Sequence, residues 1–100
     1  MDDLQRYYGD VVEEGELNIT FDIMEREHSW SRQRFASQIR QDAMAGILIL
    51  YRYGSSNEAI DVDPWSVDLT SDEVLRGLCF SPTDAAWEQY SESRRREPVK

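Results

Sequence analysis

Hydrophobic and polar residues alternate strictly between positions 16 and 24. The apolar residues that share one parity are Leu17, Ile19, Phe21 and Ile23. Because successive side chains of an extended chain point to opposite faces, this alternation predicts a half-buried strand over residues 16–24. Before it, residues 2–8 carry apolar positions at helical spacing and are followed by Gly9, which predicts a short helix.

A helical period replaces this alternation over residues 29–46, where Ser29 or Ser31 would cap the N-terminus. The residues that fall on one third of the circumference are Phe35, Ala36, Ile39, Ala43 and Gly46. The residues that would cover the remaining, solvent-facing part are Gln33, Arg34, Ser37, Gln38, Arg40, Gln41 and Asp42. The pattern predicts an amphipathic helix with an outer face rich in arginine and glutamine.

Two further strands are expected between positions 47 and 69. Residues 47–53 begin with a continuous apolar run, which indicates a central strand covered on both faces. A loop of hairpin length follows, and residues 59–69 then form the next strand. The parity of the apolar positions changes at Pro64, so we expect a bulge or break there, on a sheet edge.

Residues 70–94 contain two helix-start signals. Thr70 precedes Glu73 by three residues, a capping-box pattern that predicts a short helix ending at Cys79. Ser81 would cap a last helix with Pro82 at its first position, and this helix would end near Arg94.

The predicted order of elements is therefore α-β-α-β-β-α-α, which is typical of a small α+β domain. We expect a three-stranded sheet, mixed or antiparallel, with the helices packed on one face. Since no linker or repeat divides the sequence, residues 1–100 are predicted to form one domain. Residues 97–100 are predicted to be a disordered tail.

The cysteine content and the lengths of the apolar runs predict a cellular location. Cys79 is the one cysteine, so no internal disulfide is expected. The N-terminal residues lack the pattern of a signal peptide, and the longest apolar run, residues 45–51, is too short to cross a bilayer. We therefore expect a cytoplasmic protein that does not bind membranes.

Charge is sorted into blocks along the chain, and the net charge is −9. Residues 1–28 carry nine acids against two arginines, a net of −7, and residues 53–93 carry nine acids against one arginine, a net of −8. Residues 29–52 and 94–100 each carry a net of +3. Such a surface favours basic partners and repels nucleic acid and anionic membranes.

The side chains needed for common catalytic chemistry are scarce. Lys100 is the one lysine and no glycine-rich loop exists, which argues against Schiff-base and phosphate-loop enzymes. His28, the one histidine, cannot supply the several imidazoles of a zinc site. Cys79 lies between apolar neighbours, which favours a small buried side chain over a nucleophile. We expect neither an enzyme nor a bound metal or cofactor.

The densest group of polar side chains surrounds Trp65. The predicted partner-binding residues are Glu58, Asp61, Asp63, Trp65 and Asp68. In one interpretation these acids only keep an edge strand solvated and prevent aggregation. In the other, Trp65 anchors a partner and the acids steer a basic surface toward it. A secondary acidic group is formed by Glu13, Glu14 and Glu16.

The leading functional hypothesis is a non-catalytic acidic protein that occludes a basic partner. Inhibitors, immunity proteins and antitoxins directed against nucleic-acid-acting enzymes or toxins share this combination of small size, strong acidity and absent catalytic groups. One alternative is an accessory subunit or homo-oligomer in which basic and acidic blocks pair between chains. Another is a salt-adapted domain whose acidity serves no partner.

Overall fold

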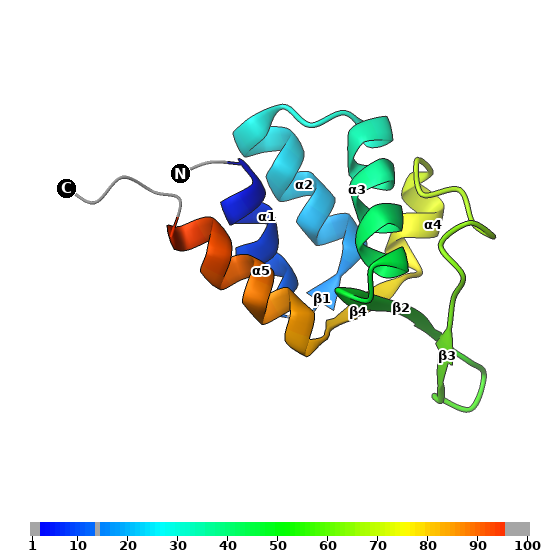
Figure 1. Ribbon diagram of the computed structural model, residues 1–100. Coiled ribbons are helices and arrows are strands. Elements are labelled where there is room, and N and C mark those ends of the chain that lie inside the picture. The colour runs from blue at the N-terminus through cyan, green and yellow to red at the C-terminus, as the bar shows by residue number, and fades with distance from the viewer. Residues whose placement is uncertain (1–2, 14, 96–100) are drawn as a thin grey trace.

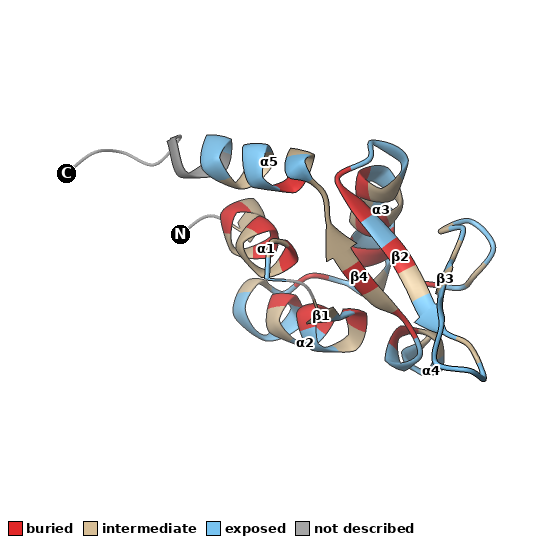
Figure 2. Ribbon diagram, turned by 90° about the horizontal axis from the view of Figure 1, so that it is seen from below, coloured by how far each residue is buried: buried red, intermediate tan, exposed pale blue. Residues whose placement is uncertain are grey.

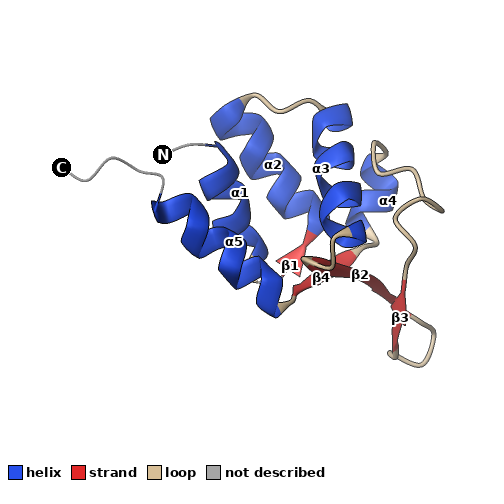
Figure 3. Cartoon of the chain, viewed as in Figure 1, coloured by secondary structure: helices blue, strands red, loops and turns tan. Residues whose placement is uncertain are grey.

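Helices and a small sheet alternate along the chain in the computed structural model, which describes residues 3–13 and 15–95 (Figures 1 and 3). The elements of these residues, in chain order, are α1 Asp3–Val11, β1 Gly15–Glu16, α2 Leu17–His28, α3 Arg32–Met44, β2 Leu48–Tyr53, β3 Ala59–Asp61, α4 Asp72–Arg76, β4 Cys79–Pro82 and α5 Asp84–Arg95. The predicted α+β class is confirmed. The predicted tail, residues 97–100, lies outside the described residues.

The sheet has four strands in the described part of the chain, in the order β1-β4-β2-β3, and every pairing is antiparallel. The prediction of three strands is therefore wrong. Strand β4, which lies between β1 and β2, is the element that the prediction missed. Its Phe80 stands opposite Gly15 on one side and Leu50 on the other.

The strand predicted over residues 16–24 is also wrong, because helix α2 begins at Leu17. The segment carries a second apolar period: Leu17, Thr20, Phe21 and Met24 are buried and follow helical spacing. Ile19, which the alternation placed in the core, is 53% exposed. Packing of this helical face against α1 and α4 overrides the period-2 pattern. The helix ends at Ser29, whose positive φ of 57° is a left-handed C-cap.

Three boundaries near the C-terminal end differ from the expected ones. The strand predicted to reach Leu69 ends at Asp61, and residues 62–71 form a loop without regular structure. Ser71, rather than Thr70, caps α4, since its Oγ accepts from the Val74 N–H at 3.5 Å. Ser81 and Pro82 do not start a helix, because both belong to β4 and α5 begins at Asp84.

Helix α3 is present where a helix was predicted, but it spans Arg32–Met44 rather than residues 29–46, and Asp42, which was predicted to face solvent, is buried. The Ser31 hydroxyl caps the helix by accepting from the Arg34 N–H at 3.1 Å, so the second of the two proposed caps is the one used. Phe35, Ala36 and Ile39 are buried on its inner face. This helix is therefore the scaffold that fixes the positions of the arginines on its other faces.

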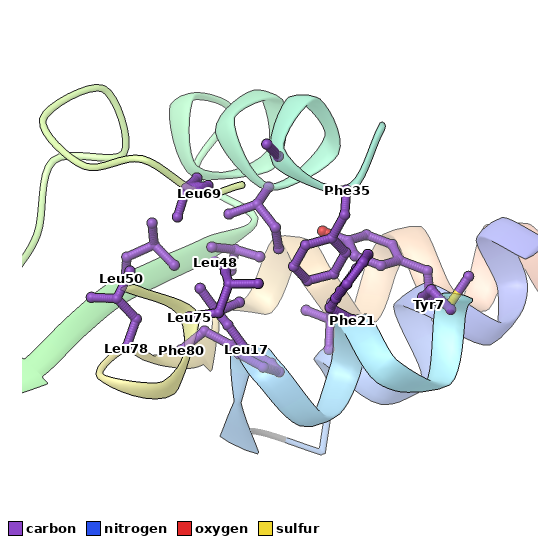
Figure 4. Close-up of a cluster of buried hydrophobic side chains, with 14 of the residues drawn as sticks. Tyr7, Leu17, Phe21, Phe35, Leu48, Leu50, Leu69, Leu75, Leu78 and Phe80 are labelled. Atoms are coloured by element: carbon purple, nitrogen blue, oxygen red, sulfur yellow. The ribbon is translucent and has the colours of Figure 1, made fainter. Parts of the chain in front are cut away.

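The core lies between the helices and one face of the sheet (Figure 4). Leu48, Leu50 and Phe80 point into it from β2 and β4, and Phe21 of α2 packs against Phe35 of α3 with ring centroids 5.2 Å apart. The opposite face of the sheet has no helix in front of it (Figure 2). The sheet therefore has a covered face and an open face.

Candidate functional site

The loop of residues 62–71, called the Trp65 loop below, presents an aromatic ring to solvent. The Asp63 carboxylate accepts from the Trp65 N–H at 2.9 Å, and the Asp63 carbonyl accepts from the Ser66 N–H and hydroxyl at 3.0 and 2.7 Å. These bonds form a tight Asx turn in which an aspartate side chain replaces a backbone acceptor. The turn holds Trp65 at its tip, where the residue is 64% exposed.

A second carboxylate orders the other end of the Trp65 loop. Asp68 accepts from both the backbone N–H and the hydroxyl of Thr70, at 3.0 and 2.5 Å. These two bonds lower the pKa of the Asp68 carboxyl, so it remains charged to a lower pH than an ordinary aspartate. Asp63 and Asp68 are therefore turn-forming groups as well as exposed acids.

Arg40 connects the Trp65 loop to helix α3. Its Nε and Nη2 donate to the carbonyl oxygens of Pro64 and Val67, each at 3.1 Å. Its guanidinium lies 5.1 Å from the centroid of the Trp65 ring, a cation–π distance. Arg40 was predicted to lie on a solvated face of the helix, and this role gives no local signal because its partners are 24 and 27 residues away in the chain.

The other two predicted site residues, Glu58 and Asp61, belong to the β2–β3 hairpin and point to opposite sides of it. A Cβ atom built at Gly54 would collide with both the Glu58 carboxylate and Ile60, so the Glu58 and Ile60 side chains lie on the same side of the hairpin. This side continues the covered face of the sheet. Asp61 stands opposite Tyr51 and shares the open face with it. The five predicted residues are thus divided among the Trp65 loop and two sides of the hairpin.

The secondary acidic group lies around the short strand β1. Glu13 is exposed just after α1, and Glu16 is exposed in β1 opposite Cys79. Glu14 lies outside the described residues. Glu16 therefore belongs to the sheet.

The ion pair with the shortest distance among the described residues lies in a cleft of about 370 Å³ that is lined by residues of α2, α3 and α4. The Arg32 guanidinium donates to both carboxylate oxygens of Asp72, at 2.5 and 3.0 Å. This pairing raises the pKa of Arg32 and lowers that of Asp72. The two charges satisfy each other, and the other charged residues that line the cleft are Asp22, Glu25 and Arg76.

A buried polar cluster lies beneath α3. Asp42, predicted to face solvent, is 1% exposed, and its carboxylate accepts from the Tyr8 hydroxyl at 3.1 Å and from Gln38 Nε2 at 3.2 Å. Burial raises the pKa of Asp42, and burial together with the Asp42 charge raises the pKa of Tyr7 well above its ordinary value. Asp42, Tyr7 and Tyr8 are all buried, so the cluster has little contact with solvent.

We expect Asp42→Asn to alter the pH dependence of stability. Since the pKa of Asp42 is higher in the folded protein, folding takes up a proton, and stability falls as the pH rises from 3.8 through the folded pKa. The asparagine variant lacks this loss, so its stability relative to the native protein should rise over that interval and then level off. Urea unfolding at a series of pH values measures the difference.

Asp68→Asn is the matched control for this titration. The folded pKa of Asp68 is lowered, so the native protein gains stability as the pH rises toward 3.8, and the stability of this variant relative to it should fall. Equal pH profiles for the Asp42→Asn variant and the native protein would contradict the assignment of a raised pKa to Asp42.

Other classes of site find less support in the structure. Residues 3–13 and 15–95 contain no group of three or more histidine, cysteine, aspartate or glutamate side chains that could hold a metal ion. None of the helices in these residues combines the length and apolar character needed to cross a bilayer. Comparisons of the chain with known protein families, curated proteins and solved structures found no match. The Trp65 loop offers an ordered aromatic ring between fixed carboxylates, an arrangement that suits recognition of basic side chains.

Proposed function

We propose that the chain is a non-catalytic acidic protein that binds and occludes a basic protein partner, in the manner of inhibitors and immunity proteins directed against nucleic-acid-acting enzymes or toxins. The observation that carries the proposal is the exposed Trp65 ring, held in place by Arg40 and flanked by Asp63 and Asp68. Aromatic anchors contribute much of the binding energy of interfaces, and an ordered anchor loses little conformational entropy on binding.

The basic block of residues 29–52 supports binding to a different protein over pairing between copies. Arg32 is bonded to Asp72, Arg34 to Asp3 at 2.9 Å, and Arg40 to the Trp65 loop. These three charges are engaged within the chain, whereas Arg52, the fourth arginine of the block, is exposed on β2, and the acidic blocks remain in excess. A net charge of −9 then steers a basic partner toward the surface from a distance.

Affinity capture from cells of the source organism, at low salt and with elution by a salt gradient, tests the proposal. A captured protein should be basic, and after purification its affinity, measured by calorimetry, should fall steeply as salt rises. Affinity that does not depend on salt would contradict an electrostatic partner. If nothing is captured and the melting temperature rises strongly with KCl, the salt-adapted alternative is favoured.

We expect Trp65→Ala to weaken binding of the captured partner by about tenfold or more, because it removes the anchor ring. Trp87→Ala is the matched control, since Trp87 is a second exposed tryptophan with acidic neighbours, Glu88 and Glu92, on α5. Calorimetry of both variants at one salt concentration makes the comparison. An equal or larger loss with Trp87→Ala would move the site from the Trp65 loop to α5.

A further inference from the structure

The open face of the sheet combines side chains from all four strands. The register aligns Glu16 with Cys79, Cys79 with Tyr51, and Tyr51 with Asp61, so these side chains form one row across the sheet. Ile49 and Tyr53 flank the row on β2 and are 47% and 60% exposed. Figure 2 shows that no helix lies in front of β2 and β4 on this side.

Polarity on the open face follows a simple order. Its centre is apolar and aromatic, and Tyr51 and Tyr53 meet there edge to face with ring centroids 5.6 Å apart. Its two ends carry the exposed carboxylates of Glu16 and Asp61. The strand residues that point to this face, within the described part of the chain, include no lysine or arginine. They are Glu16, Ile49, Tyr51, Tyr53, Ala59, Asp61, Cys79 and Ser81.

These charges argue against a second copy of the chain as the occupant. In a two-fold symmetric pair of sheets, the carboxylates of Glu16 and Asp61 in one copy would approach those of the other across a desolvated interface. Both copies would also carry a net charge of −9, so the long-range force between them is repulsive. A partner with basic side chains spaced around an apolar one complements both the ends and the centre of the face.

We propose that the open face is a docking surface for a basic polypeptide segment. Apolar side chains of the segment pack on Ile49 and Tyr53, and its arginine or lysine side chains contact Glu16 and Asp61. Tyrosine and arginine are both enriched in protein interfaces, and an arginine can also stack on an exposed ring. The inference rests on the proposed function and adds a second contact surface to the Trp65 loop.

The test uses the full chain and a short synthetic peptide in which arginines flank leucines, with a glutamate-flanked peptide as the charge control. In NMR titrations at low salt, the arginine peptide should shift backbone signals of β2, β3 and β4, and the glutamate peptide should not. The double variant Ile49→Ser/Tyr53→Ser should weaken arginine-peptide binding by about tenfold or more. Ile19→Ser, at an exposed isoleucine on α2, should leave binding unchanged.

Circular dichroism of each variant establishes that it folds, and Asp61→Asn supplies a second test that leaves the apolar side chains intact. It should reduce peptide affinity and also the dependence of that affinity on salt. Absence of binding at millimolar peptide, shifts confined to the Trp65 loop, or unchanged affinity in both the double variant and Asp61→Asn would overturn the inference.

The same variants separate this inference from the proposed function. If a captured basic partner binds in a salt-dependent manner, loses affinity with Trp65→Ala and is indifferent to Ile49→Ser/Tyr53→Ser, the proposed function stands and the open-face inference fails. If no basic partner exists but the arginine peptide still binds the sheet, the proposed function fails and the open face remains a binding surface.

Discussion

Phe80→Ala should lower the free energy of unfolding by about 3–5 kcal/mol, the range typical of a phenylalanine removed from a core. Phe80 is 1% exposed and lies in β4, between β1 and β2, where its ring fills the space under the helices (Figure 4). The loss combines the lost burial of the ring with the cavity that its removal leaves. Urea unfolding, followed by far-ultraviolet circular dichroism, measures it.

Tyr53→Ala is the matched control, because Tyr53 is an aromatic residue of the same sheet but is 60% exposed on the open face. Its replacement should change stability by no more than about 1 kcal/mol. Equal effects of the two substitutions would mean that residues 79–82 do not form a central strand with Phe80 turned inward. The comparison therefore tests β4, the strand that the sequence pattern did not predict.

Arg40→Ala should lower the free energy of unfolding by about 2–3 kcal/mol, since it removes two half-buried hydrogen bonds made by a charged donor. The carbonyl oxygens of Pro64 and Val67 lose their partner, and the Trp65 ring loses the cation beneath it. Amide exchange in residues 62–71 should become faster in the variant than in the native protein, and this increase should be larger than any increase in α3. Urea unfolding and hydrogen exchange of the variant provide the two measurements.

Two further arginine variants make this result specific. Arg40→Lys keeps the charge but cannot reproduce the planar fork of donors, so it should recover only part of the lost stability. Arg52→Ala removes an exposed arginine from the end of β2 and should change stability by no more than about 0.5 kcal/mol. Unaltered exchange in the Trp65 loop of Arg40→Ala would show that Arg40 does not hold it.

Much of the secondary structure can be predicted from local patterns, where one pattern dominates. Helix α3, its Ser31 cap and the β2–β3 hairpin each have such a pattern, and each is present. Residues 17–24 satisfy both a strand period and a helical period, and only packing against α1 and α4 decides between them. Strand β4 is four residues long, and the cap-like Ser81 and Pro82 obscured it.

The candidate site also combines residues that the local sequence predicts with a residue whose role depends on packing. Local composition singles out Trp65 and its neighbouring aspartates, because Asp61, Asp63 and Asp68 all lie within four residues of it. Arg40 gives no such signal, since its contacts depend on how α3 packs beside the Trp65 loop. Glu58 and Asp61 point to opposite sides because they lie three positions apart in an extended hairpin, a separation that the alternation of side chains alone predicts.

The position of β4 in the chain has a consequence for the order in which the protein can fold. Strands β1 and β2 have no hydrogen-bonded contact with each other, and both pair with residues 79–82. During synthesis, the sheet therefore cannot form its centre until most of the chain has left the ribosome. Closing these long loops is entropically costly, so we expect sheet formation to follow helix formation and to limit the folding rate.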